Sequence, residues 1–390
     1  MHRAARTLLF LLPLALAATA GASSCGQKPA AYQWDLPTGF PVPHVPADNP
    51  MTDEKVELGR YLFYDKKLSD NQTYACATCH DQAKAFTDGR AQAIGSTGMM
   101  TRHGALGLTN VAYLAAYTWQ NPGITTLEDQ ARLPMFGESP PELALAGKEE
   151  ELLGRLRDDA RYPTMFKAAF PDDADPLASS VGIQRVLQAI GSFERTLISG
   201  HSPYDRFTYG HDATAMSDSA QRGLALFNTN RLECYHCHGG FNFSGAVSDA
   251  GEMLTNVPYQ NTGLYDVDGR GSYPAGDQGL IEITEDPLDM GKFRPPTLRN
   301  IVLTAPYMHD GSVATLDDVL DIYGAGGRNV TTGPNFGDGR SNPFKNIFLH
   351  GFTLTPDERA DLHAFFDALT DDDFLHDPRF SDPFAPGATP

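Results

Sequence analysis

The sequence is poor in several features that mark common classes of protein. It has only 5 cysteines and 2 tryptophans in 390 residues, and 49 aspartates and glutamates outnumber 30 lysines and arginines. The formal charge of −19 argues against a nucleic-acid partner, because another polyanion would be repelled at long range. Beyond the N-terminus, no run is apolar enough to span a bilayer, and strand signals are weak. The apolar content of 41% is ordinary for a globular protein, and the length allows two domains.

The N-terminus is typical of an export signal. A basic start containing Arg3 and Arg6 precedes an apolar run over 7–20 that is too short for a membrane span. Two cleavage sites remain open: an Ala-x-Ala site at 18–20, and an imperfect lipobox at 22–25 in which Cys25 would carry a lipid anchor. We therefore expect residues 1–25 to be a signal peptide. The mature protein is then periplasmic, and anchored to the membrane if Cys25 is lipidated.

The other four cysteines form two pairs with the same spacing. Each pair is Cys-x-x-Cys followed directly by His, at 76–80 and at 234–238. Four cysteines of an exported protein could form two disulfides, and a single Cys-x-x-Cys could be a redox dithiol or half a zinc site. Two complete patterns favour two c-type haems, because two cysteines on one turn reach both vinyl groups and the next His ligates iron. The expected haem attachment residues and iron ligands are Cys76, Cys79, Cys234, Cys237, His80 and His238.

The chain looks internally duplicated. Segments 59–63 and 223–227 each precede a haem motif, and each has the apolar spacing of a helix. Capping boxes that start at Thr315 and Thr355 predict two further helices. Apolar spacing predicts two more helices, which cover 149–157 and 186–197.

Long stretches rich in Gly, Pro, Asn and Asp separate these helices, at 244–296 and 324–345. Such long loops are often functional. We therefore predict a mainly α protein with two c-type cytochrome-like haem domains and long loops. An N-terminal haem domain would cover 26–210 and a C-terminal one 211–390.

Further motifs resemble those of the bacterial di-haem cytochrome c peroxidase/MauG superfamily across nearly all of the mature chain. The matching segments are 85–90, 110–113, 127–130, 292–300 and 303–312, and within the superfamily 117–122 and 134–138 are similar to the MauG-like MbnH branch. The resemblance implies unlike roles for the two haems. The N-terminal haem, on His80, would be open and meet hydrogen peroxide. The C-terminal haem, on His238, would be six-coordinate and hold or relay electrons.

The resemblance also implies a second axial ligand on the C-terminal haem. This ligand is a methionine in the peroxidase branch and a tyrosine in MauG-like proteins, and Tyr323 falls at that position. An anionic phenolate stabilises high-valent iron, whereas a thioether favours the reduced state. Met308 and Met290 are the alternative ligands, and Tyr323 could otherwise be only the last core aromatic of its helix.

Around the first haem, the family places a Gln, an acid and a proline. Gln130 and Pro134 match two of these, and Glu142 matches the acid, with Glu138 as the alternative because the loop here is two residues longer. A carboxylate beside the iron can move a proton from the inner to the outer oxygen of peroxide. Trp119 matches a tryptophan between the haems, where an indole can carry a hole; otherwise it is a core residue.

The superfamily often holds a calcium ion on backbone oxygens and one Asn side chain. Thr304 and Pro306 match the backbone positions, but His103 stands near the place of the Asn. Imidazole is a poor ligand for this ion, which prefers hard oxygens. Two roles remain for His103, a switchable iron ligand and a plain surface histidine. We expect the second. His309 matches a family histidine near the propionates of the second haem.

The leading hypothesis is a periplasmic MauG-like oxidoreductase with Glu142, Gln130 and Trp119 as catalytic residues. It would react with hydrogen peroxide and share the oxidising equivalents as ferryl iron on two haems. It would then oxidise a tryptophan residue of a small exported partner protein. The alternative is a peroxidase that reduces hydrogen peroxide with electrons from a small cytochrome or cupredoxin. A non-enzymatic di-haem electron carrier would leave Gln130 and Glu142 without a purpose.

Overall fold

The computed structural model describes residues 32–387. The predicted signal peptide and Cys25 lie outside the described residues. Within 32–387, we find no helix with the length and apolar character that crossing a bilayer requires.

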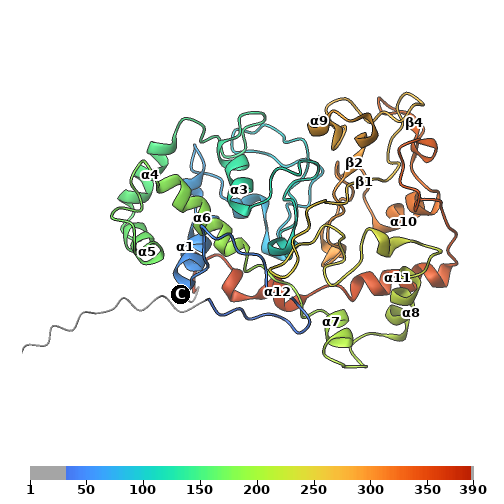
Figure 1. The fold of residues 1–390 in the computed structure, drawn as a ribbon, viewed down its shortest axis with the longest axis horizontal. Helices are drawn as coiled ribbons and strands as arrows, with labels where there is room; N and C mark the ends of the chain where they lie inside the picture. Colours follow the sequence, from blue (N-terminus) through green and yellow to red (C-terminus); the bar gives the residue numbers. More distant parts are fainter. Residues whose placement is uncertain (1–31, 388–390) are drawn as a thin grey trace, which may run out of the picture. The chain divides into compact units, whose positions relative to one another are not determined.

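Helices dominate the described chain, as predicted (Figure 1). The helices of the N-terminal half are α1 (Asp53–Tyr64), α2 (Cys76–Cys79), α3 (Leu127–Phe136), α4 (Glu149–Asp158), α5 (Tyr162–Ala169), α6 (Gly182–Glu194) and α7 (Pro203–Thr208). Those of the C-terminal half are α8 (Asp218–Phe227), α9 (Ile281–Thr284), α10 (Leu316–Gly324), α11 (Pro356–Asp367) and α12 (Asp372–His376). The strands form two antiparallel pairs, β1 (Gln260–Asn261) with β2 (Lys292–Phe293) and β3 (Asn329–Val330) with β4 (Gly337–Asp338). The predicted long loops contain both pairs.

Both predicted capping boxes are present. At the start of α10, the Thr315 hydroxyl accepts a hydrogen bond of 3.1 Å from the Asp318 N–H, and the Asp318 carboxylate accepts one of 3.2 Å from the Thr315 N–H. Thr355 and Glu358 exchange the same pair of bonds at the start of α11. Each N-cap contributes about 1 kcal/mol of stability. Helix α4 matches its prediction closely, and α6 ends at Glu194, earlier than the predicted end.

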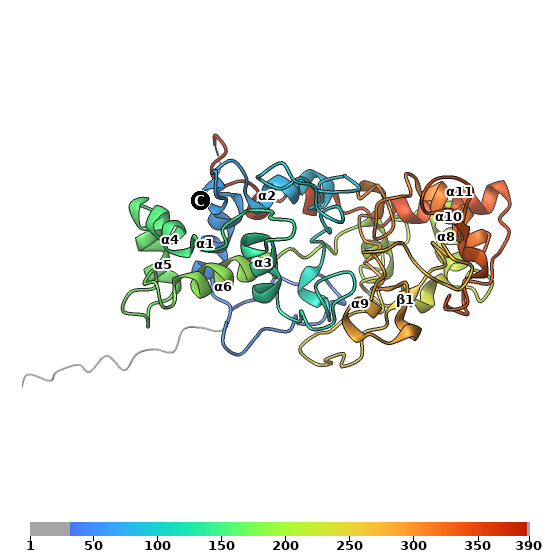
Figure 2. The same cartoon turned by 90° about the horizontal axis from the view of Figure 1, so that it is seen from above.

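The predicted duplication corresponds to two equivalent helix crossings. Helix α1 packs on α6 at Gly59, where a Cβ atom would lie 1.9 Å from the Ala189 carbonyl oxygen. Helix α8 packs on α11 at Gly223, where a Cβ atom would lie 2.0 Å from the Asp361 carbonyl oxygen. Figure 1 and Figure 2 both show α1 beside α6 and α8 beside α11. In each half, a glycine therefore lets the helix before the haem motif touch the backbone of a second helix.

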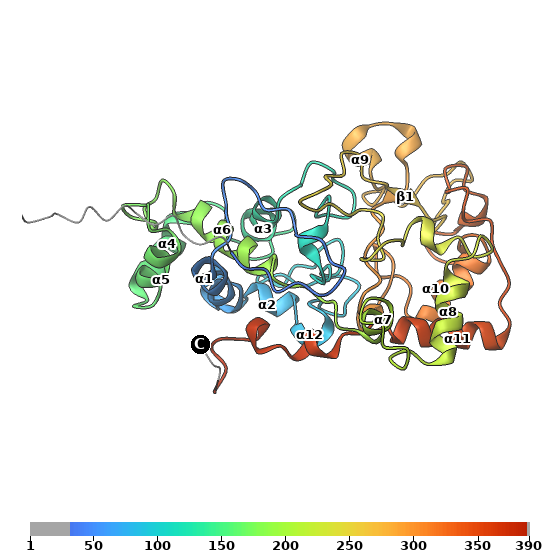
Figure 3. The same ribbon diagram turned by 60° about the horizontal axis from the view of Figure 1, so that its bottom comes forward.

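The C-terminal segment returns to the N-terminal half. Phe374 and Phe380 share an apolar cluster with Phe86, and the Gln82 side-chain amide donates to the carbonyl oxygens of Phe374 (3.2 Å) and Asp377 (3.0 Å). Figure 3 shows this end of the chain, with α12, alongside the blue N-terminal elements. The last part of the predicted domain 211–390 thus packs on the preceding half, and the domain boundary near 210 stays a prediction.

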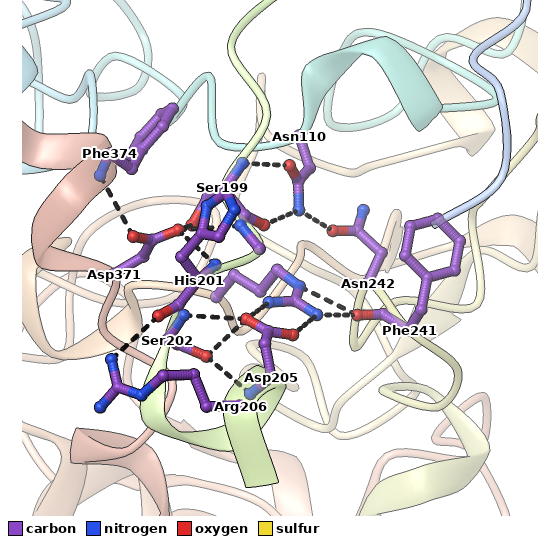
Figure 4. A network of polar contacts seen from close by, with 12 residues as sticks. Asn110, Ser199, His201, Ser202, Asp205, Arg206, Phe241, Asn242, Asp371 and Phe374 are labelled. Carbon is purple, nitrogen blue, oxygen red and sulfur yellow. Dashed lines mark hydrogen bonds and ion pairs between the residues drawn. The ribbon is translucent and has the colours of Figure 1, made fainter. Parts of the chain in front are cut away.

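A buried polar network forms where segments of both halves meet (Figure 4). The Asn110 side-chain amide donates hydrogen bonds of 3.0 Å to the Ser199 carbonyl oxygen and to the Asn242 side-chain oxygen. Asp371, the N-cap of α12, accepts a bond of 3.0 Å from the Ser199 hydroxyl. All four side chains are fully buried. Buried polar groups are costly without partners, so these bonds favour one arrangement of the segments that supply them.

Candidate active site

The first Cys-x-x-Cys-His motif forms helix α2 and the residue that follows it. The His80 nitrogen Nδ1 lies 2.8 Å from the Phe86 carbonyl oxygen. Because a carbonyl only accepts, Nδ1 carries the proton and Nε2 keeps its lone pair. Burial lowers the pKa of His80, which keeps the ring neutral. A neutral imidazole with a free Nε2 is what an axial iron ligand requires.

The second motif repeats this arrangement. His238 Nδ1 lies 3.2 Å from the Phe243 carbonyl oxygen and 3.1 Å from that of Pro296, and burial lowers the His238 pKa. In both motifs the accepting phenylalanine has a positive φ, 62° at Phe86 and 47° at Phe243. Such values are uncommon for residues with a side chain. Both halves therefore turn the chain in the same unusual way to hold the imidazole.

The residues of both motifs fit a covalently attached haem. The four motif cysteines form no disulfide, and each lines a cavity beside the histidine of its own motif. The cavity at Cys234, Cys237 and His238 encloses about 1370 Å³ of atom-free space, part of it open to solvent. Its walls are largely apolar, as a porphyrin requires.

The predicted distal residues come together at the first motif. Gln130 and Pro134 lie on α3, and both line the same cavities as Cys79, His80 and Glu142. Burial raises the pKa of the Glu142 carboxyl.

The alternative acid, Glu138, lies away from this site. Its side chain is exposed and lines neither cavity beside His80. Of the two acids, only Glu142 is in a position to meet a molecule bound there.

Trp119 lies between the two motifs. It lines a cavity with Cys79 and His80, and it also lines the cavity that contains His238 and Tyr323. The indole is half-buried and packs in the apolar cluster of the C-terminal half. Trp119 therefore borders both the cavity of His80 and the cavity of His238.

Arg294 borders the same two cavities, and sequence reasoning missed it. Its side chain is 3% exposed, and it forms no ion pair with any carboxylate of residues 32–387. Burial lowers its pKa to about 10. A buried cation without a counter-charge is unfavourable, and the propionates of a bound haem are anions that would remove this cost. The one available signal was an arginine in an otherwise apolar Phe-Arg-Pro-Pro segment.

Tyr323, on α10, lines the second cavity with Cys234, Cys237 and His238. Burial, and then the nearby cysteines, raise the pKa of its phenol. Met308 lines this cavity too, so it stays geometrically available as the alternative ligand.

Met290 is placed differently from these two. It is absent from the lining of the second cavity and packs in the apolar cluster with Tyr273. Tyr323 and Met308 are therefore the two predicted ligands that border the cavity of His238.

The predicted backbone ligands of calcium border a further cavity. Thr304 and Pro306 line it together with Asp88. The Asp88 oxygen Oδ1 accepts hydrogen bonds from the N–H groups of Arg90 (3.0 Å) and Ala105 (3.3 Å), whereas the buried Oδ2 has no partner among the described residues. The Asp88 carboxylate therefore offers an unpaired oxygen, the kind of hard ligand that calcium prefers, to the cavity that Thr304 and Pro306 line.

His103 is not the surface histidine that we expected. Its side chain is only 13% exposed, and its Nε2 lies 3.0 Å from the Asp277 carboxylate. The sequence could not indicate this, because Asp277 is distant along the chain. His309 lies 3.2 Å from the other Asp277 oxygen, stacks on Phe293 at 3.5 Å, and lines the cavity of His238. Although burial raises the pKa of the Asp277 carboxyl, the hydrogen bond from His103 and the nearby His309 imidazole outweigh this effect and hold the pKa below its usual range.

Comparisons with known proteins agree with this geometry. Residues 53–213 match the family model of di-haem cytochrome c peroxidase. The chain is 33% identical to cytochrome-c peroxidase IdrP1 of Denitromonas iodatirespirans, over 98% of this chain and 97% of the relative. It is 34% identical to the methylamine utilization protein MauG of Methylophilus methylotrophus, over 76% and 78% of the two chains. A crystal structure of a MauG-like protein associated with microbial copper homeostasis superposes with a TM-score of 0.87 and 46% identity, covering 91% of this chain and all of that one.

Proposed function

The chain belongs to the di-haem cytochrome c peroxidase/MauG family, on its MauG-like branch, and is a haem-dependent oxidoreductase; from this we propose that it uses hydrogen peroxide to oxidise a residue of a partner protein. The proposed residue is a tryptophan. One observation carries the proposal: the two haem cavities have unlike surroundings and share Trp119. A glutamine and an acid line the first, and a tyrosine lines the second.

At the first site, the haem held by Cys76, Cys79 and His80 would supply the iron that activates peroxide. Glu142 accepts a proton from the inner oxygen of the peroxide and returns it to the outer oxygen, which leaves as water. The amide of Gln130 donates a hydrogen bond that orients the peroxide. Pro134 fills space beside it and limits the pocket to a small molecule.

At the second site, Tyr323 would join His238 in holding the iron of the haem attached to Cys234 and Cys237. Burial disfavours a free phenolate there, so a positive partner is needed to hold the anion. The phenolate would in turn favour the oxidised states of the positive centre that binds it. Trp119 carries oxidising equivalents from the first cavity to the second, and the partner protein returns electrons by the same route.

Further proposals follow from the same residues. Calcium would bind the Thr304 and Pro306 carbonyl oxygens, with Asp88 as the side-chain ligand in place of the missing Asn. The apolar run at 7–20 supports export to the periplasm, and Cys25 is the proposed lipid anchor.

The second candidate function is a peroxidase that takes electrons from a small cytochrome or cupredoxin. It is favoured by Met308, which lines the second cavity, and by the relatives named cytochrome-c peroxidase.

Adding one equivalent of hydrogen peroxide to the ferric protein separates the two functions. A MauG-like enzyme develops a long-lived near-infrared band, the sign of oxidising equivalents shared by two haems, without any added reductant. A peroxidase that needs prior reduction gives no such band. Repeating the experiment with Trp119→Phe tests the shared pathway, because this variant keeps an aromatic ring but is far harder to oxidise.

A further inference from the structure

A second carboxyl group, from Glu194, borders the peroxide cavity. Glu194 is the last residue of α6 and lines the cavity with Cys76, Gln130 and Glu142. It is 5% exposed, and its oxygen Oε2 has no hydrogen-bond partner among the described residues. A buried carboxyl without a partner strongly disfavours its charged form.

The charged neighbours of Glu194 do not neutralise it. Arg195 donates its Nη2 to both oxygens of Glu128, at 2.7 Å each, and its Nη1, which has no partner among the described residues, forms no ion pair with Glu194. Tyr117 and Cys76 also face this region, but neither carries a positive charge. Burial, followed by the charge of Glu128, raises the pKa of Glu194 to about 8, and Arg195 opposes this only in part. At neutral pH the group is therefore mainly an uncharged acid.

We propose that Glu194 is a proton-holding residue of the peroxide site, which delivers a proton into the cavity as hydrogen peroxide is reduced to water. This inference rests on the proposed function. Reduction of one hydrogen peroxide molecule to two waters breaks the O–O bond, forms two O–H bonds, and takes up two electrons and two protons. The two electrons come from the partner-protein residue that becomes oxidised, or from another donor.

Glu142 cannot supply those two protons. Its role is to move a proton of the peroxide from one oxygen to the other, which adds none to the total. A second acid beside the same cavity fills this need. Glu194 would give up one proton per turnover and regain it from solvent through the open part of the cavity.

A merely structural role makes a different prediction. If Glu194 only fills space as a neutral acid, then Glu194→Gln, which has the same shape and no charge, should leave turnover unchanged. If it supplies protons, the amide cannot replace it, whereas Glu194→Asp can in part. The matched control is Glu149→Gln, an exposed residue on α4, away from both cavities.

The test is the rate of peroxide reduction by the haem-loaded protein with a small-molecule electron donor, measured across the pH range around 8. For wild-type protein, the rate falls as pH rises through about 8, because the acid is lost. Glu194→Gln lowers the plateau rate roughly 100-fold, within the usual range for a general acid, and removes this fall. Glu194→Asp keeps it. An unchanged rate and pH profile in Glu194→Gln overturns the inference, whereas a wild-type protein that reduces no peroxide overturns the proposed function instead.

An infrared measurement keeps the inference testable if the Glu194→Gln variant fails to fold. Glu142→Gln protein should still show the band of a protonated carboxyl at neutral pH, and this band should vanish as pH rises through about 8. If this variant shows no protonated carboxyl band, or one that persists as pH rises through this range, Glu194 does not release a proton there and the inference is wrong.

Discussion

The backbone of Arg294 holds Trp119 in place. The Arg294 N–H donates a hydrogen bond of 2.8 Å to the Trp119 carbonyl oxygen, and its guanidinium Nε donates one of 3.1 Å to the carbonyl oxygen of Thr118. Arg294 belongs to the C-terminal half and Trp119 to the N-terminal half. Trp119 is the residue proposed to carry oxidising equivalents between the haem cavities. It is thus held by a residue of the C-terminal half, the half to which it would pass those equivalents.

Removing the Arg294 side chain should slow this transfer. Arg294→Met loses the bond to Thr118 and the buried cation between the cavities. A hydrogen bond from a charged donor contributes about 1.5–3 kcal/mol, so we expect a slowing of roughly tenfold or more in oxidation of the second haem after peroxide is added. Stopped-flow absorbance measures this step. Arg294→Lys keeps the cation and should be less affected, and an unaltered rate in Arg294→Met would show that this contact is unimportant for transfer.

The peroxide reaction itself should depend on an ionised Glu142. Burial raises the pKa of this carboxyl, and the base must be charged to accept a proton, so the rate should rise with pH through that raised pKa. Glu142→Gln should react roughly 100-fold more slowly and lose this rise. The measurement is the rate of the first absorbance change after mixing with peroxide. A normal rate in Glu142→Gln, with Glu138→Gln slowed instead, would move the role to Glu138.

The two helix crossings should be sensitive to the smallest enlargement. Gly59→Ala and Gly223→Ala each place a Cβ atom within about 2 Å of a carbonyl oxygen, so each should lower the free energy of unfolding by about 1–3 kcal/mol. Chemical denaturation of the haem-loaded protein measures this loss.

The control for both crossings is Gly154→Ala. Gly154 lies on α4 with open space around it, so this change should raise stability by up to about 1 kcal/mol. Equal effects at all three glycines would mean that close packing is not what the first two provide.

Calcium binding should depend on Asp88 and not on His103. After dialysis against a calcium buffer and removal of free metal, elemental analysis should find calcium in the wild-type protein and in His103→Asn, but much less in Asp88→Asn. The reason is that only Asp88 offers an unpaired carboxylate oxygen to the cavity of Thr304 and Pro306. Equal calcium in Asp88→Asn and wild-type protein would contradict this ligand assignment.

Features that depend on residues close together in the chain could be predicted from the sequence. The haem motifs and the capping boxes at Thr315 and Thr355 depend on spacings of a few residues, and the structure contains both capping boxes. The repeated glycines hinted at duplication, but the partners Ala189 and Asp361 that make them necessary lie far away along the chain.

Features set by burial and distant pairing could not be predicted. Nothing in the sequence shows that Arg294 has no carboxylate partner within residues 32–387, that Glu194 borders the cavity of His80, or that Asp277 contacts His103. Each depends on which segments the fold brings together. The resemblance supplied the distal residues, but only geometry separated the exposed Glu138 from Glu142.

The most direct measurement is the absorption and electron paramagnetic resonance spectrum of the ferric protein, compared between wild type and Tyr323→Met. We predict one high-spin and one low-spin haem in the wild type, with a methionine–iron charge-transfer band only in the variant. If the wild-type protein already shows that band, and Met308→Leu removes it, then the second iron is bound by sulfur. The proposed oxidation of a partner protein would then give way to ordinary peroxidase activity.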